Sequence, residues 1–156
     1  CFLTAPQVVR AGNIIRAFTT TVVCDSPFAW KEPKTVYYDF TGMGNVSSNQ
    51  TILNESANSF YTAPTAVVLV ASGAGAVTIT NLSDDDRVSS LVLLEGETIT
   101  MNCDLQIISS NLTTYPLNSS SFNTNWLRFI PGYNNLLITG NLTSVSITSP
   151  VAVKLA

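Results

Sequence analysis

The stretch LVLLEGETITMNCDLQIIS (Leu91–Ser109) decides the expected fold, because apolar and polar side chains alternate along it on both sides of Glu95-Gly96. A repeat of two residues is typical of a β-strand with one buried face, and the glycine supplies the positive φ that a tight turn needs. The stretch therefore predicts a β-hairpin. A second stretch, WLRFIPGYNNLLITGNLTSVSIT (Trp126–Thr148), alternates in the same way around two further glycine turns. The apolar positions that carry this alternation are Leu127, Phe129, Leu136, Ile138, Val145 and Ile147.

The composition indicates one main domain with a polar but weakly charged surface. A chain of 156 residues is long enough to bury one core. Charged residues make up only 11%, against a usual share of about 25%, so Ser, Thr and Asn carry most of the polarity. A formal net charge of −3 is too small to attract a polyanion, and we expect no binding to nucleic acid.

The chain contains no histidine, which removes the usual general base and the usual zinc ligand. Its three cysteines, Cys1, Cys24 and Cys103, are odd in number and lack metal-site spacing. Cys103 lies on the apolar face of an alternating strand, where we expect a buried thiol. The longest apolar tract, Ala66–Ile79, is interrupted by Ser and Gly and is shorter than the roughly 20 residues of a membrane span. We expect no metal, no cofactor and no membrane partner.

Three regions follow one another along the chain. Residues 1–25 are expected to form a short β unit that belongs to another structure, and a start at Cys rather than Met suggests part of a longer protein. Residues 26–33 contain two prolines and are expected to form a stiff linker, with Phe28 and Trp30 packed against a flanking domain. Residues 34–156 contain about eight to ten short strands and no helical pattern. This predicts an all-β fold, an antiparallel β-sandwich of the jelly-roll type.

The acidic residues form no catalytic or metal-binding pattern. The triplet Asp84–Asp86 lacks the spaced ligands of a calcium loop, and we interpret it as a solvated turn. A glycosidase needs two carboxylates that face each other across a cleft, whereas Glu95 and Glu97 flank a turn and Glu55 lies in a polar loop. We therefore expect no catalytic residues and no enzymatic activity.

Seven asparagines begin an N-x-Ser/Thr triplet, the acceptor sequence for N-glycosylation. We attribute the triplets to a composition rich in Asn, Ser and Thr, because no secretion signal or paired cysteines accompany them. A glycosylated surface domain is the alternative. The seven residues are Asn45, Asn49, Asn54, Asn81, Asn111, Asn118 and Asn141.

Aromatic and amide side chains in the second half suggest a weak candidate for a binding surface. Tyr115, Trp126 and Tyr133, with Asn134 beside them in the sequence, are the residue types that stack on and hydrogen-bond to sugars in carbohydrate-binding sandwiches. Trp126 alternates out of phase with Leu127, which places it on the face opposite the core. The alternative interpretation is a packed tryptophan, as is usual in β-sandwiches.

Four motifs together resemble the distal tail protein of long-tailed bacteriophages, also called the tail hub component. VVCDSPFAWKEP (Val22–Pro33) is similar to the strand and aromatic-proline linker between the two domains of that family. The other three are similar to its glycine turn and strand, its hairpin and its late strand. They are ASGAGAVTITNL (Ala71–Leu82), LEGETITMNC (Leu94–Cys103) and FIPGYNNLLITG (Phe129–Gly140).

The resemblance implies that residues 1–25 end a ring-forming N-terminal β domain and that residues 34–156 form a galectin-like β-sandwich. It implies a structural protein of the virion tail tip, or baseplate hub, that is encoded by a phage or prophage and assembled in the host bacterial cytoplasm. The full-length protein is expected to be a homo-hexamer that connects the tail tube to tail-associated and receptor-binding proteins for host attachment. Binding of cell-wall polysaccharide is the alternative. A galectin-like fold alone does not confer sugar binding, so this alternative depends on a specific site.

Overall fold

The computed structural model describes residues 2–3, 7–11, 14–23, 28–57, 60–112 and 121–154. None of these residues is helical, so no helix among them could cross a membrane. The chain divides into two compact units, the first made of Cys1–Ala29 with Lys154–Ala156 and the second of Trp30–Val153. The predicted all-β fold is confirmed.

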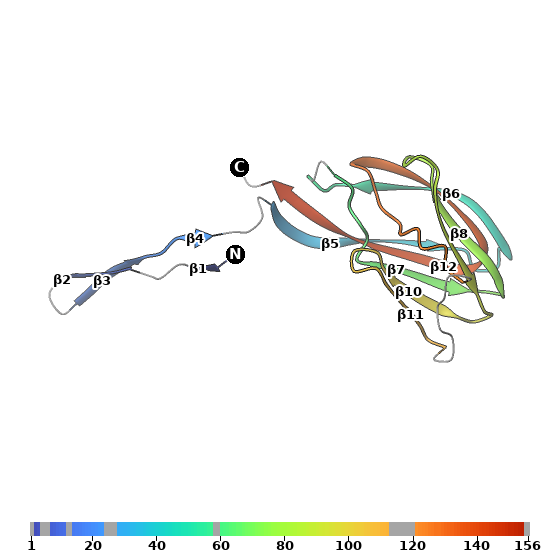
Figure 1. Ribbon diagram of the computed structural model, residues 1–156, viewed down its shortest axis with the longest axis horizontal. Helices are drawn as coiled ribbons and strands as arrows, with labels where there is room; N and C mark the ends of the chain where they lie inside the picture. Colours follow the sequence, from blue (N-terminus) through green and yellow to red (C-terminus); the bar gives the residue numbers. More distant parts are fainter. Residues whose placement is uncertain are drawn as a thin grey trace. The chain divides into compact units, whose positions relative to one another are not determined.

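The first unit contains two antiparallel strand pairs (Figure 1). Strand β1 pairs with β4, and β2 pairs with β3. Val8, Val9 and Ile15 lie about half exposed on the second pair, because two strands alone have no opposite layer to cover them. The bounds are β1 Phe2–Leu3, β2 Gln7–Ala11, β3 Ile14–Thr19 and β4 Val22–Val23.

The second unit is a β-sandwich of two antiparallel layers that share strand β12 (Figure 1). One layer has the order β6, β12, β8, β9, and the other has the order β5, β12, β7, β10, β11. The bounds of the eight strands are β5 Phe28–Asp39, β6 Asn45–Asn54, β7 Ala66–Ala71, β8 Gly75–Asn81, β9 Arg87–Leu93, β10 Thr98–Asn102, β11 Ile107–Ser110 and β12 Gly132–Lys154.

Strand β12 passes from one layer to the other at Gly140. Residues 136–139 pair with β8, whereas the pairing with β7 begins at Leu142. The φ of Gly140 is 120°, a conformation that glycine adopts without strain. An irregularity between Leu142 and Ser144 then inserts one extra residue. Buried positions consequently change from even numbers before the bulge to odd numbers after it, so both halves of β12 turn their apolar side chains inward.

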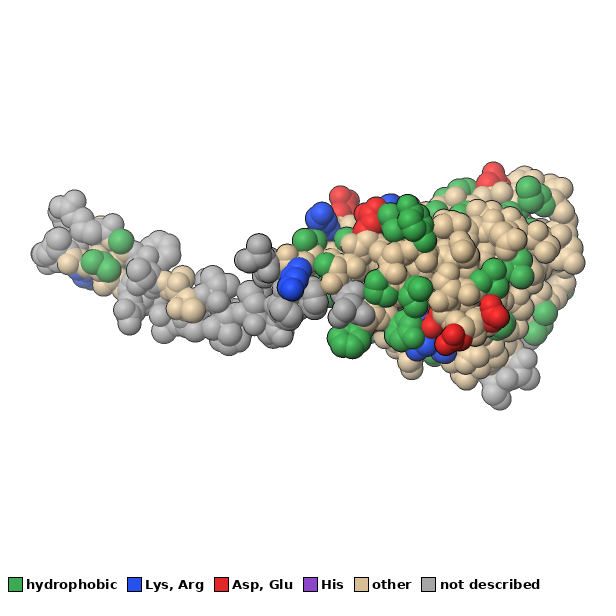
Figure 2. Space-filling model, turned by 90° about the horizontal axis from the view of Figure 1, so that it is seen from above, with side chains coloured by type: hydrophobic (Ala, Val, Ile, Leu, Met, Phe, Trp, Pro, Cys, Tyr) green, Lys and Arg blue, Asp and Glu red, His purple; other side chains and the backbone are tan. Residues whose placement is uncertain are grey.

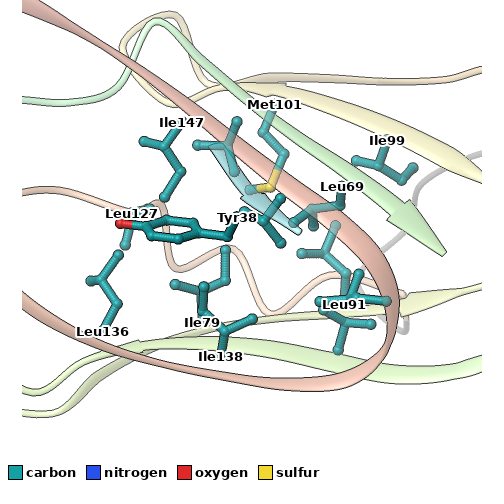
Figure 3. Packing of buried hydrophobic residues seen from close by; sticks show 14 of the residues in the cluster. Tyr38, Leu69, Ile79, Leu91, Ile99, Met101, Leu127, Leu136, Ile138 and Ile147 are labelled. Carbon is teal, nitrogen blue, oxygen red and sulfur yellow. The ribbon is translucent and has the colours of Figure 1, made fainter. Parts of the chain in front are cut away.

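The core lies between the two layers, as the alternation of side chains predicts (Figure 3). Cys103 is buried with them, and this burial raises the pKa of its thiol to about 11. The predicted buried thiol is thus confirmed. The largest side chains with almost no exposed surface are Phe129, Leu69, Ile79, Leu91, Leu93, Ile99, Met101, Leu127, Leu136, Ile138, Leu142 and Ile147.

The predicted hairpin between the two halves of Leu91–Ser109 is wrong. Strand β9 pairs with β8, whereas β10 lies between β7 and β11 in the other layer. The turn at Glu95-Gly96 therefore carries the chain from one layer to the other. Strand β10 cannot pair with β9, because residues 121–123 already occupy the free edge of β9. Val92 N–H of β9 donates to the carbonyl of Ser121, and Asn123 N–H donates to the carbonyl of Ser90.

The segment predicted as a linker overlaps strand β5, which begins at Phe28. The boundary between the two compact units falls between Ala29 and Trp30. The expected packing of Trp30 is wrong, since its side chain is 62% exposed. The reason is that residues 30–35 of β5 extend beyond the core, and the inward-facing positions of this strand begin only at Val36.

Candidate functional site

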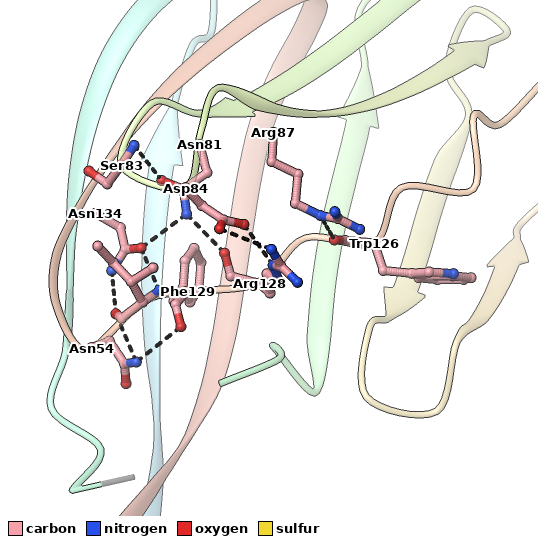
Figure 4. A network of polar contacts seen from close by, with 10 residues as sticks. Asn54, Asn81, Ser83, Asp84, Arg87, Trp126, Arg128, Phe129 and Asn134 are labelled. Carbon is pink, nitrogen blue, oxygen red and sulfur yellow. Dashed lines mark hydrogen bonds and ion pairs between the residues drawn. The ribbon is translucent and has the colours of Figure 1, made fainter. Parts of the chain in front are cut away.

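A buried network of asparagine amides holds the irregular segment that precedes β12 (Figure 4). The Asn134 amide accepts a hydrogen bond from Ile130 N–H at 2.9 Å and donates to the carbonyls of Ile130 and Gly132 at 2.9 and 3.0 Å. Asn81 Nδ2 donates to Asn134 Oδ1 at 3.0 Å and to the carbonyl of Arg128 at 2.9 Å. Side chains thus pair with backbone groups of this segment that have no partner in a neighbouring strand.

The same segment carries Arg128, which is paired with a buried aspartate. The guanidinium donates from Nε to Asp84 Oδ2 at 2.7 Å and from Nη2 to Oδ1 at 3.1 Å, the bidentate geometry of a strong charge-assisted pair. These hydrogen bonds hold the pKa of Asp84 below its ordinary value. The interpretation of the acidic triplet as a solvated turn is therefore wrong for Asp84, which is buried, although Asp85 and Asp86 are exposed.

The guanidinium of Arg128 also lies over the ring of Tyr61, 3.6 Å from the ring centroid. This distance is typical of a cation–π contact. Tyr61 is 47% exposed, so the contact holds its ring in one position at the protein surface. Because Arg128 is itself fixed by Asp84, the chain of contacts runs from the sandwich interior to a surface aromatic residue.

Tyr61 forms one wall of a groove of about 320 Å³, and Trp30 lines the same groove. Backbone hydrogen bonds fix the segment that carries Tyr61: Thr62 and Phe129 exchange two of 2.9 Å, and the Pro64 carbonyl accepts one from Cys103 N–H at 3.0 Å. The groove is also lined by Ser56, Thr62, Asp104 and Pro150. We name it the Trp30–Tyr61 groove.

Two of the other carboxylates considered in the sequence, those of Glu97 and Glu55, have structural partners. The Glu97 side chain is fully buried and accepts hydrogen bonds from Leu94 N–H at 2.8 Å and from the Ser110 hydroxyl at 2.6 Å. Glu55 forms a surface ion pair with Lys34 at 2.7 Å. In the part of the chain that the structure describes, no three His, Cys, Asp or Glu side chains group together as a metal site would require.

The residues predicted as a sugar-binding shelf do not form one surface. Trp126 is partly buried and packs edge-to-face on Phe122, with ring centroids 4.9 Å apart, and Figure 4 shows its ring pointing away from Asn134. Asn134 is fully buried, and its amide is occupied by the network described above. Tyr133 is 69% exposed. Tyr115 lies outside the described residues.

The asparagines that begin the N-x-Ser/Thr triplets also differ in their exposure. Asn54 and Asn81 are buried, and their amides hold backbone carbonyl groups, so the folded chain offers no access to them. Asn141 donates to the carbonyl of Ala74 at 3.0 Å. Asn118 lies outside the described residues. Asn45, Asn49 and Asn111 are exposed, so burial removes only two of the acceptors that the structure describes.

Sequence reasoning missed Trp30 and Tyr61 as surface aromatics, because the first was expected to pack and the second stood in no pattern. It also missed the pair of Asp84 and Arg128, which are 44 residues apart. One signal was present: an arginine within an otherwise apolar run, next to buried Leu127 and Phe129, has to find a partner for its charge.

Comparison with known families matches residues 28–149 to a family described as a phage tail C-terminal domain. The chain belongs to this family. The match confirms the predicted resemblance to a phage tail protein and gives the domain a structural role in the virion tail, among other tail proteins. No curated protein and no solved structure matches the chain.

Proposed function

We propose that this phage tail domain belongs to the tail tip, where it connects the tail tube to the proteins that attach to the host. The observation that carries the proposal is the family match over residues 28–149, together with the motifs that resemble a distal tail protein. The role is one of binding and support rather than catalysis. In the full-length form the protein is a homo-hexamer, with residues 1–25 contributing to the ring.

The sandwich supports this role because its interior fixes the relative positions of both layers. A close-packed core transmits force with little deformation, and the buried amide network fixes even the irregular segment before β12. The surface seen in Figure 2 is mostly uncharged, in keeping with the 11% charged residues of the chain. Contacts on such a surface depend on shape and hydrogen bonds more than on charge.

The first unit supports assembly, because it leaves apolar side chains uncovered. Ile15 is 58% exposed, and Val8 and Val9 are close to half exposed. A two-stranded ladder is at best marginally stable by itself in water. Burial of these side chains against other protein surfaces would supply the missing stabilisation, as a ring of β domains does.

Native mass spectrometry of the full-length protein, alone and mixed with purified tail-tube and receptor-binding proteins, tests the proposal. We expect hexamers that bind both classes of protein. Ile15→Asp should weaken hexamer formation, whereas the matched control Leu82→Asp, on an exposed leucine of the β8–β9 turn, should not. Monomers that bind neither class of tail protein would contradict the proposed role.

A second candidate function is the binding of cell-wall polysaccharide. The observation that favours it is the Trp30–Tyr61 groove and not the shelf predicted from the sequence, since Trp126, Tyr133 and Asn134 do not share one surface.

A further inference from the structure

The Trp30–Tyr61 groove exposes two aromatic side chains of different segments beside one depression. Trp30 is 62% exposed and Tyr61 is 47% exposed, and both line the groove of about 320 Å³. This volume falls at the lower end of ligand sites, which measure about 300–1,000 Å³. Exposed aromatic rings around a hollow are costly in water and are typical of a surface that is covered by a ligand.

The Tyr61 wall is fixed before any ligand arrives. Its ring rests on Arg128, and Arg128 is held in a bidentate pair by buried Asp84. The next residue, Thr62, exchanges backbone hydrogen bonds with Phe129. A ligand therefore does not have to order this wall on binding, which lowers the entropic cost of association.

Polar groups at the same groove define the ligand further. Asp104 is exposed and, among the described residues, is the only charged one that lines the groove; it forms no ion pair with any of them. Its carboxylate accepts hydrogen bonds and repels anions, which disfavours phosphates, nucleic acid and acidic sugars. The remaining walls add the partly exposed polar side chain of Thr65.

We propose that the Trp30–Tyr61 groove binds a short segment of neutral or amine-bearing saccharide. A sugar ring has an apolar C–H face, which an aromatic ring covers, and a rim of hydroxyl donors, which a carboxylate accepts. The groove supplies both, in a volume that suits one or two sugar rings. This inference rests on the second candidate function and deepens it by naming the class of sugar. It does not depend on the connector role, because that role requires contacts with tail proteins only.

The chain offers a direct optical test, because it contains only two tryptophans, Trp30 and Trp126. In the variant Trp126→Phe, Trp30 is the only indole that reports. We expect its fluorescence to change and saturate on titration with short neutral or amine-bearing oligosaccharides. Acidic oligosaccharides of the same length should leave the signal unchanged, and isothermal titration calorimetry of the unsubstituted protein should give the same preference.

Two variants and a control separate the groove from the rest of the surface. Trp30→Ala should weaken binding in calorimetry by at least about tenfold, the loss typical of an aromatic contact residue. Asp104→Asn should weaken binding of amine-bearing sugars more than that of neutral ones, since it removes the negative charge. Tyr133→Ala removes an aromatic side chain that is 69% exposed on β12 and should bind as the parent does.

The outcome can be read independently of the tail-tip role. Trp30→Ala should enter hexamers and bind purified tail proteins as the parent does. The inference is overturned if neither neutral nor amine-bearing oligosaccharides give a saturating signal, if acidic ones bind as well as these, or if Trp30→Ala binds sugar as tightly as the parent. It is also overturned if Trp30→Ala instead loses a tail protein, because the groove is then a protein contact.

Discussion

The substitution Gly140→Ala is expected to destabilise the sandwich strongly, because it acts where β12 changes layers. The φ of Gly140 is 120°, and a non-glycine residue held in such a conformation costs about 1–3 kcal/mol. A Cβ built at this position would lie 2.6 Å from the carbonyl oxygen of Ala76 and 2.9 Å from the Cα of Val77. Both are backbone atoms of β8, which is paired on either side, so they cannot move alone.

Overpacking of this kind adds about 1–3 kcal/mol, which gives a total of about 4 kcal/mol for Gly140→Ala. Gly96→Ala is the matched control: Gly96 also has positive φ, at 70°, but no atom lies within 4 Å of the position that a Cβ would take there. It should cost only about 1 kcal/mol, the contribution of the backbone conformation alone. Of the difference of about 3 kcal/mol, about 2 kcal/mol comes from the close contact with β8 and about 1 kcal/mol from the more strained backbone conformation of Gly140.

Urea unfolding followed by tryptophan fluorescence measures both variants. With a slope of about 1–3 kcal/mol per M, a difference of about 3 kcal/mol separates the two unfolding midpoints by roughly 1–3 M. Far-UV circular dichroism at zero urea checks that each variant is folded. If the two midpoints coincide, Gly140 is not pressed against β8, and the account of how β12 crosses between layers is wrong.

Three further predictions concern buried polar groups. Asp84→Asn should cost about 2 kcal/mol, because it breaks a buried ion pair. Because the fold lowers the pKa of Asp84, the carboxylate stabilises the fold fully above its pKa in the unfolded chain, about 3.9, and this stabilisation is lost as the pH falls through the folded pKa. Urea unfolding below about pH 4 should therefore show that Asp84→Asn loses less of its free energy of unfolding to acid than the parent does. Equal losses in the two proteins would refute this. With Cys1 and Cys24 changed to Ser, the buried Cys103 thiol should react with a disulfide reagent at about pH 8 only after urea unfolding, and rapid reaction of the folded chain would show that the core opens. Asn134→Ala should cost about 2 kcal/mol, since it leaves the Ile130 N–H without its acceptor, whereas the Ile130 carbonyl keeps its hydrogen bond from Asn54. A cost near zero in the same urea assay would mean that water replaces the amide.

The alternation of side chains was sufficient to predict the layers, because burial between two sheets imposes a repeat of two residues on every strand. Leu91, Leu93, Ile99, Met101 and Cys103 are all buried, as their spacing indicated. The same reasoning could not predict the bulge after Leu142. A run of Leu, Thr, Ser and Val can bury either its even-numbered or its odd-numbered side chains. Which set is buried depends on the strand that lies beside it.

Pairing partners were less predictable than strands, as Glu95-Gly96 shows. Gly96 adopts the expected positive φ of 70°, so the local turn was predicted correctly while the hairpin was wrong. A turn of this kind reverses the chain equally well within a layer and between layers. The choice depends on which edges are already occupied, here by Ser121 and Asn123 along β9, and this is a property of the folded chain.

The candidate site was hidden from the sequence for a related reason. Trp30, Tyr61 and Asp104 come from three segments far apart in the chain, and no spacing connects them. The four residues proposed from the sequence were close together along the chain, but neighbours on a strand point to opposite sides. Tyr133 and Asn134 show the consequence, since one is 69% exposed and the other is fully buried.

The interior network and the surface groove are parts of one arrangement. Asn81 holds the carbonyl of Arg128 and Asn134 holds Ile130. The Arg128 side chain, which contacts Asp84 and Tyr61, joins both to the groove wall. A sandwich could have packed this segment with apolar side chains alone, which would be as stable. Buried amides and a buried ion pair instead admit only one register, because any shift leaves their donors and acceptors unpaired. We infer that this specificity keeps Tyr61 in place at the surface, so that a loss of the interior amides should loosen the groove wall before it unfolds the sandwich.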